Sequence, residues 1–400
     1  MHYLDNAATS WPKPEIVYES LDQGFRQFLS AKRGTSQTSR HGAAALDAAR
    51  QTLAELLHVP DASRIVFTGG CTQALNLAIQ AFPWQPGDGI VISALEHHAL
   101  SRPVRKVARE KQLEFYVVPY TDEEPFSLDA YEQLLRTKPN IRLVATMHAS
   151  NVIGSILPVE AIGRLARQYG KYYLLDAAQS AGALPIDAQR FNADMIALPA
   201  HKSLYGPPGI GALYVSENVP LQTFMEGGTG SDSGEHAVRL VVPDMFEVGT
   251  IPMPQIHAMA AGAEWVMETG IETIRQHETR LLQHLLDGLK ALPEVIVYGH
   301  THVERKTPVV SFNLIGKQPK SVGELLFDRY DIALRAGFHC APMAHQAIGT
   351  LPLGGTIRAS LGYYTTLDDV DALLNALGHI GDVTHHSDRK DSLSEERQPR

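Results

Sequence analysis

Cysteine is scarce in this sequence: its 400 residues contain only two, Cys71 and Cys340. Two cysteines cannot build a disulfide framework, and their scarcity favours a reducing compartment, so we expect a cytoplasmic protein. Long apolar runs are also missing, since no segment approaches the ~20 residues needed to cross a bilayer. The first residues contain no basic stretch followed by an apolar one, and no signal peptide is therefore expected.

Positive charge is in deficit: 35 lysines and arginines face 44 acidic residues, which gives a formal net charge of −9. This balance argues against a partner such as nucleic acid or another polyanion. The adjacent histidines His97 and His98 have no second cluster with metal-ligand spacing, so we expect no metal. The length exceeds what one hydrophobic core usually holds, and two domains are expected.

Helical and strand patterns alternate between residues 14 and 216. Helical periodicity is present at 15–30, 43–58, 72–82, 102–112, 127–138 and 158–169. Short apolar, β-branched runs are present at 64–68, 90–94, 114–119, 141–147, 172–176, 194–198 and 210–215. This alternation predicts an α/β fold with a mainly parallel seven-stranded sheet sandwiched by helices. Ligands of such sheets bind beyond the carboxyl ends of the strands.

The remaining chain predicts a smaller α+β domain. Residues 217–255 lack clear periodicity, and a long helical stretch follows at about 255–291. Short segments at 295–298, 308–314, 322–330 and 356–361 come next, with a last helix at 367–378. We therefore expect a large domain at 14–255, a small domain made of 1–13 and 256–380, and a polar, disordered tail at 381–400.

Two predicted strands end in side chains that can do chemistry. One ends at Asp176, and the next along the chain is followed closely by His201 and Lys202. An aldehyde cofactor needs an amine to hold it covalently, and a pyridine ring needs a carboxylate to keep its nitrogen protonated. Taken singly, such a lysine is usually a solvated loop residue and such an aspartate a helix cap. Together at one sheet edge, they predict a site for pyridoxal 5′-phosphate (PLP).

Other polar residues follow neighbouring strands. Gly70, Cys71 and Thr72 open a helix, where free N–H groups and the helix dipole favour a phosphate, although most such turns are only connections. His97 could lie flat over an aromatic cofactor and shuttle protons, or be an ordinary surface histidine. Asn151 could give a directed hydrogen bond, or simply form a turn before glycine.

The smaller domain contributes two candidates. Cys340 is flanked by Gly, His and Pro in a loop, so its thiol is expected to be accessible and reactive, unless it is an unremarkable loop thiol. Arg358 lies within a short apolar strand, where a guanidinium suits bidentate capture of a substrate carboxylate. The alternative is an edge-strand arginine that faces water.

These residues, in this order, resemble the cysteine desulfurase branch of the class V aminotransferases, which are PLP enzymes of fold-type I. The resemblance extends from Tyr3 to about Leu377, nearly the whole chain. The most specific motifs are Glu96-His97-His98, Asp176-Ala-Ala-Gln179, His201-Lys202 with Tyr205-Gly206, Phe246-Glu-Val-Gly-Thr250, Arg335-Ala-Gly-Phe-His-Cys340 and Arg358-Ala-Ser-Leu361.

The resemblance implies roles around the cofactor ring. Lys202 would bind the cofactor covalently and carry the substrate proton. Asp176 would pair with the pyridinium nitrogen, and His97 would stack on the ring. Gln179 would face the phenolic oxygen, with Asn151 nearby, close to the substrate carboxylate.

It also implies roles at the phosphate and the substrate. Gly70, Cys71, Thr72 and His201 would hold the phosphate. Thr250 would reach the phosphate of the partner subunit's cofactor, which makes the protein a homodimer. Arg358 would bind the substrate carboxylate, and Cys340 would be the nucleophile.

The implied activity is conversion of L-cysteine to L-alanine, with a persulfide on Cys340 that passes to a thiol of an acceptor protein. A related PLP lyase or aminotransferase acting on another amino acid, such as selenocysteine, is the alternative, and a PLP-binding scaffold without turnover is a third. The chain departs from the family at Pro199, where a Ser or Thr that contacts the phosphate is usual. It also departs at Cys71, a position that is often Thr in the family. The stretch between Cys340 and Arg358 is short, as it is in the branch of the family that needs a separate sulfur acceptor.

Overall fold

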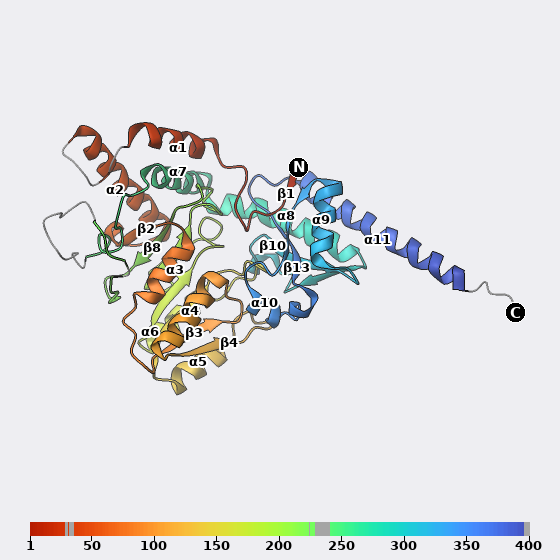
Figure 1. The fold of residues 1–400 in the computed structure, drawn as a ribbon, viewed down its shortest axis with the longest axis horizontal. Helices are drawn as coiled ribbons and strands as arrows, with labels where there is room; N and C mark the ends of the chain where they lie inside the picture. Colours follow the sequence, from red (N-terminus) through yellow and green to blue (C-terminus); the bar gives the residue numbers. More distant parts are fainter. Residues whose placement is uncertain (29–30, 32–35, 224, 229–240, 396–400) are drawn as a thin grey trace.

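The computed structural model describes residues 1–28, 31, 36–223, 225–228 and 241–395, with side-chain detail up to residue 381. Its largest element is a seven-stranded sheet in the order β2-β8-β7-β6-β5-β3-β4, shown in Figure 1. Its strands are β2 (Ile65–Thr68), β3 (Gly89–Ser93), β4 (Glu114–Val118), β5 (Ile141–Met147), β6 (Tyr172–Asp176), β7 (Met195–Pro199) and β8 (Gly211–Val215). All neighbours pair in parallel except β8, which is antiparallel to β2 and β7. The predicted mainly parallel α/β sheet is confirmed.

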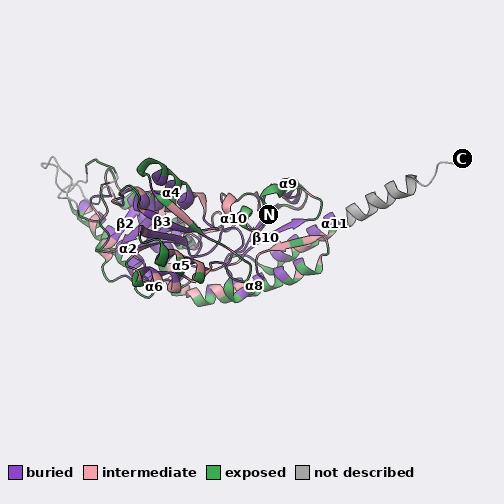
Figure 2. Ribbon diagram, turned by 90° about the horizontal axis from the view of Figure 1, so that it is seen from below, coloured by how far each residue is buried: buried purple, intermediate pink, exposed green. Residues whose placement is uncertain are grey.

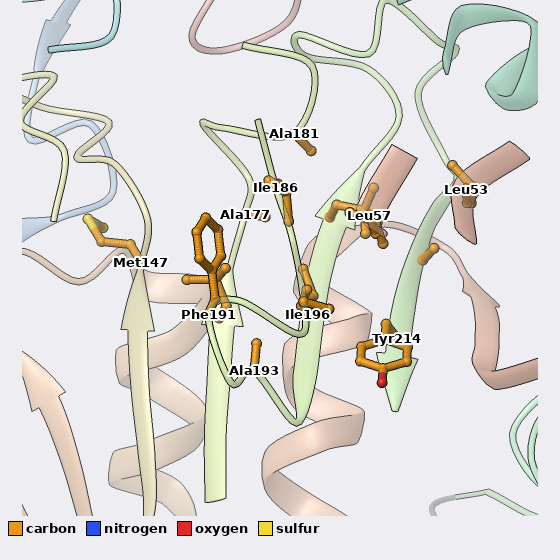
Figure 3. Packing of buried hydrophobic residues seen from close by; sticks show 14 of the residues in the cluster. Leu53, Leu57, Met147, Ala177, Ala181, Ile186, Phe191, Ala193, Ile196 and Tyr214 are labelled. Carbon is orange, nitrogen blue, oxygen red and sulfur yellow. The ribbon is translucent and has the colours of Figure 1, made fainter. Parts of the chain in front are cut away.

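Helices cover both faces of this sheet. One face packs against α2 (Gln37–Leu57), α5 (Leu128–Thr137) and α6 (Val159–Gln168), and the other against α3 (Cys71–Gln80) and α4 (His98–Lys111). Figure 2 shows α4 and α6 on opposite sides of the sheet. Leu53 and Leu57 of α2 belong to one buried cluster with Ile196 of β7 and Tyr214 of β8, part of which is drawn in Figure 3. Because both faces are covered, the central strands are apolar throughout rather than alternating.

The predicted long helix at 255–291 is two helices. Gly270, with φ at 86°, separates α7 (Met253–Thr269) from α8 (Ile271–Ala291). A positive φ of this kind is costly for any residue with a Cβ. Helix α7 packs against α1 (Glu15–Gln27) and α2, whereas α8 contacts β9 and α11. The division proposed at residue 255 stays a prediction, and this change of packing partners favours a boundary near Gly270.

A second, four-stranded antiparallel sheet has the order β12-β13-β10-β9. Its strands are β9 (Val295–Tyr298), β10 (Val309–Leu314), β12 (Arg335–Gly337) and β13 (Thr356–Ser360), and the helices around it are α8, α9 (Pro319–Tyr330), α10 (Pro342–Ala347) and α11 (Leu367–Glu395). The N-terminus joins this part, because β1 (His2–Tyr3) pairs in parallel with β11 (Ile332–Ala333). Leu4, Phe312, Leu285 and Leu373 are fully buried together in its core.

The last helix is longer than predicted. Helix α11 ends at Glu395 rather than near residue 378, and the tail expected at 381–400 stays a prediction. No proline interrupts 367–395, and its polar residues are compatible with a helix that projects away from the body, as in Figure 1. Residues 396–400 lie outside the described part of the chain. Within the described residues, no helix combines the length and apolar character needed to cross a membrane.

The open edge of β2 is covered by a buried ion pair. Glu247 accepts a hydrogen bond from the Phe67 amide at 2.9 Å. It also forms an ion pair with Arg50, whose Nη2 lies 2.5 Å from the carboxylate. The same guanidinium donates to the Ile65 carbonyl. Two side chains thus satisfy backbone groups that a further strand would otherwise bind. This explains why the Phe246–Thr250 motif contains a buried glutamate.

A candidate active site between two sheets

A cavity of about 330 Å³ lies where the carboxyl ends of the central strands face the smaller sheet. Side chains of both parts of the chain line it. All but one of the predicted cofactor residues are present: Gly70, Cys71, Thr72, His97, Asn151, Asp176, Gln179, His201 and Lys202, and the predicted substrate residue Arg358 joins them. The structure therefore brings together residues that are far apart in the sequence.

Asp176 ends β6, and Lys202 follows the neighbouring parallel strand β7. Burial lowers the pKa of Lys202, and the Asp176 carboxylate opposes this shift. Burial likewise raises the pKa of Asp176, while the Ala178 amide, which donates to it at 2.9 Å, and Lys202 act in the opposite direction. A half-buried lysine and a buried carboxylate thus face one cavity and stabilise each other's charge.

Cys71 makes a contact with Asp176 that the sequence did not indicate. Its thiol lies 3.5 Å from Asp176 Oδ1 as a hydrogen-bond donor. Burial, and next the nearby Asp176 charge, raise the pKa of this thiol well above its usual value. Cys71 is therefore a neutral donor to the carboxylate.

The turn before α3 is shaped to admit an anion. Gly70 has a φ of 134°, and a Cβ there would meet open space. No side chain caps the first turn of α3, so its amides are free to bind a ligand. A Cβ on Gly211 would lie 2.8 Å from the Gly70 backbone, so glycine is required where β8 passes the turn. Thr72 is exposed beside these amides, and Pro199 lines the cavity without a hydroxyl.

Two of the cavity histidines, His97 and His201, are neutral at physiological pH. His97 caps α4, where its Nδ1 accepts from the Ala99 amide at 3.0 Å, and this contact puts the ring proton on Nε2. Burial and then Lys202 lower the pKa of His97 to about 3. Burial and then Lys202 also lower the pKa of His201 to about 4. His97 can therefore stack on a ring without adding charge.

The opposite side of the cavity carries a fixed guanidinium. Arg358 is 1% exposed, and its Nη1 donates to the Asn151 carbonyl at 3.0 Å. Its Nη2 pairs with Asp5 at 2.5 Å, a partner that the sequence analysis did not identify. Arg358 Nε and Asn151 Oδ1 are buried and have no protein partner in the described structure. An unpaired donor and acceptor at a buried site fit a polar ligand.

Cys340 lies at the rim rather than inside the cavity. It lines an adjoining groove that shares Thr72, His97 and Ala99 with the cavity. Its thiol is free and half-buried, as expected for an accessible nucleophile. Arg335 Nη2 lies 3.5 Å from Cys340 Sγ.

Arg335 is a cavity residue to which the sequence analysis gave no role. It is paired across β12 and β13 with Arg358, which puts two guanidinium groups side by side. Arg335 begins the motif that ends at Cys340, and this was the one sign in the sequence that it belongs to the site. Its position beside Arg358 depends on the register of β12 and β13, which a single sequence does not reveal.

Two predicted contacts, those of Gln179 and Thr250 with the cofactor, stay predictions. Gln179 lines the cavity, but its Nε2 donates to the Ala7 carbonyl at 3.0 Å. Thr250 is exposed and does not line the cavity, so its predicted contact with the partner subunit's cofactor stays a prediction.

Comparisons with known proteins agree with this geometry. The family model described as Aminotransferase class-V matches residues 2–373. The chain therefore belongs to the class-V aminotransferase family.

Its curated relatives narrow the branch. A probable cysteine desulfurase of Halobacterium salinarum is 34% identical over 94% of this chain and 90% of that protein. A cysteine desulfurase of Pectobacterium atrosepticum is 33% identical over 94% of this chain and 92% of its own length. The chain spans 55% of a third relative, a probable cysteine desulfurase of Mycolicibacterium paratuberculosis, at 34% identity.

Solved structures of the same branch share the fold. The apo cysteine desulfurase of Thermococcus onnurineus has a TM-score of 0.87 and 30% identity, covering 95% of this chain and 94% of that one. The S-sulfonic acid form of the cysteine desulfurase CsdA of Escherichia coli has a TM-score of 0.84 at 30% identity, with the same coverage. The resemblance inferred from the motifs is confirmed.

Proposed function

We propose that this chain is a PLP-dependent cysteine desulfurase that converts L-cysteine to L-alanine and leaves the sulfur as a persulfide on Cys340. The observation that carries the proposal is the cavity that joins Lys202 and Asp176, with a free thiol at its rim. An amine and a carboxylate alone fit many PLP enzymes, whereas the thiol points to sulfur chemistry.

The cavity residues fit PLP. The free amides of Cys71 and Thr72 and the open Gly70 turn suit its phosphate. Asp176 suits the ring nitrogen, and Lys202 suits the aldehyde carbon. When bound, PLP supplies an electron sink that weakens bonds at the substrate's α- and β-carbons.

The chain's own residues supply binding and proton transfer. Arg358 offers its unpaired Nε, with Arg335 beside it, to the substrate carboxylate. Lys202, whose pKa is lowered by burial, can take the proton from the substrate's α-carbon and return one to carbon. His97, neutral and fixed by its contact with Ala99, would hold the face of the cofactor ring.

The sulfur step balances without an added oxidant or reductant. The Cys340 thiolate attacks the substrate sulfur, an S–S bond forms, and the Cβ–S bond breaks. The electron pair of the broken bond stays on carbon and is protonated, so alanine leaves and Cys340 carries the persulfide. An acceptor thiol must then remove the outer sulfur to restore the enzyme.

The test uses the protein reconstituted with PLP and supplied with L-cysteine and dithiothreitol. We expect alanine and sulfide in equal amounts, and a mass increase of one sulfur atom on Cys340 when no reductant is present. The Cys340→Ala variant should keep the visible absorbance of the bound cofactor but lose alanine formation from cysteine. Substantial turnover by Cys340→Ala would favour a related lyase, such as one acting on selenocysteine, in which Cys340 is auxiliary.

The proposal includes a homodimer, a cytoplasmic location and a protein acceptor. Thr250, on an exposed segment away from its own chain's cavity, supports a role at a neighbouring subunit. The scarcity of cysteine supports the compartment. Sedimentation of the PLP-bound protein tests the dimer, and Thr250→Ala should weaken PLP retention if Thr250 reaches the partner's cofactor.

A further inference from the structure

The groove next to the cavity carries a basic face on a chain of net negative charge. It encloses about 590 Å³ and is lined on one side by α4. Its cationic side chains are Arg102, Arg105, Lys106 and Arg109, and its lining contains no carboxylate. The chain as a whole has a net charge of −9, so this concentration of positive charge is local.

The basic face follows from the helical repeat of α4. Residues at positions i, i+3, i+4 and i+7 lie on one side of a helix, and the four cations have this spacing from Arg102 onward. The opposite side, which includes Leu100, Val104 and Val107, is buried against the sheet. All four cations are exposed, and Figure 2 shows green, the colour of exposed residues, on α4.

The contacts of these four side chains leave their positive charges free to pair with a partner. Lys106 Nζ donates to Gln80 at 2.6 Å, and Arg105 lies over the Phe115 ring and near Met343. Among the described residues, no ion pair to a carboxylate is formed by any of the four. A partner with negative charge could therefore pair with them without breaking an existing salt bridge.

Cys340 opens into this groove and is held there. Its carbonyl accepts from the His98 amide at the start of α4 at 2.8 Å, and the preceding His339 carbonyl accepts from Asn151 at 2.7 Å. His339 and Cys340 both adopt left-handed backbone angles, with φ of 47° and 57°. A loop fixed on both sides does not carry the sulfur outward, so the acceptor thiol must enter the groove.

We propose that α4 is the docking surface for an acidic segment of a thiol-bearing acceptor protein. This inference rests on the proposed function. The four cations extend from Arg102 to Arg109, or about 10 Å of helix, which is longer than a small thiol needs and suits a short acidic segment of a protein. Docking there puts the acceptor thiol beside Cys340. The thiolate attacks the outer sulfur of the persulfide, forms a new persulfide on the acceptor and releases the Cys340 thiolate, with no net oxidation.

The test measures sulfur transfer to peptides of known charge. The PLP-bound protein is loaded with ³⁵S from labelled cysteine and mixed with cysteine peptides of equal length whose flanks are acidic, neutral or basic. We expect transfer to the acidic peptide to be about tenfold faster than to the neutral one at low salt, and slowest to the basic one. Raising the salt to about 0.3 M should remove most of this preference.

Matched variants separate the groove from the overall charge. Arg102→Glu/Arg109→Glu should abolish or reverse the ranking of the peptides. Arg136→Glu/Arg164→Glu makes the same charge change on α5 and α6, which cover the opposite face of the sheet, and should preserve the ranking. An unchanged ranking in the first variant, or no acidic preference in the natural chain, overturns the proposal.

Two further readouts keep the outcomes distinct. Alanine formation with dithiothreitol is measured for every protein, and its absence in the natural chain would refute the proposed function rather than the docking surface. Stoichiometric binding of inorganic tripolyphosphate, combined with equal transfer to all three peptides, would also overturn the proposal and make the groove a site for small anions.

Discussion

Replacing Glu247 with alanine tests whether the ion pair at the edge of β2 stabilises the sheet that carries the site. The change removes the carboxylate and leaves the Arg50 guanidinium, which is 5% exposed, without its partner. It also leaves the Phe67 amide unpaired. Breaking a buried pair in this way costs about 3–5 kcal/mol, so we expect a loss of that size in the free energy of unfolding.

The matched control is Glu160→Ala. Glu160 pairs with Arg190 at 2.8 Å, but the two side chains are 45% and 66% exposed. Exposed pairs contribute at most about 1 kcal/mol because water and salt screen them. Urea unfolding followed by circular dichroism measures both variants at one protein concentration and pH.

A double variant separates the charge from the shape. Arg50→Met/Glu247→Leu removes both charges and fills the same space, so it should cost less than Glu247→Ala alone. If Glu247→Ala lost no more stability than Glu160→Ala, the buried pair would not be protecting the edge of β2. If the double variant were the less stable one, hydrogen bonds to the strand would matter more than the buried charge.

Three further outcomes are expected. Ellman's reagent should modify one thiol in the native protein, the half-buried Cys340, and reach Cys71 only in denaturant, because Cys71 is buried and its pKa is raised; two thiols reacting at once would contradict this. Asp176→Asn should lower kcat/KM for alanine formation on the order of 10²–10³-fold while the fold, checked by circular dichroism, is retained. His148 and His345 are buried, and burial lowers the pKa of each to about 4. Unfolded histidine takes up a proton below about pH 6.5, so the free energy of unfolding should fall between pH 6.5 and 4 by up to about 1.4 kcal/mol per pH unit for each. The double variant His148→Gln/His345→Gln should have a shallower slope in urea unfolding, and an equal slope would refute the assignment.

The positions of Lys202 and Asp176 could be predicted from the sequence because neighbouring parallel strands end at one sheet edge. The contacts of Asp5 with Arg358 and of Arg335 with Cys340 could not, since they depend on strand register and on the docking of the N-terminus. Contacts between distant segments have no periodic signal in a single sequence.

The helix errors have a local cause. One glycine inside an apolar helical pattern lowers helix stability by only about 1 kcal/mol, so the periodicity continued across Gly270. The conformation at that residue is set by packing, because α7 and α8 lie on different parts of the molecule. The polar composition after residue 381 suggested disorder, although it contains no helix breaker before Glu395.

Asn151 follows a strand of the central sheet, yet its side chain binds the His339 carbonyl and its own carbonyl binds Arg358. One residue thus links the loop that contains Cys340 to the buried guanidinium of Arg358. Any separation of the central sheet from the smaller sheet would break both hydrogen bonds together. The Cys340 loop and the Arg358 guanidinium would therefore lose their shared support in a single event, so their positions are coupled.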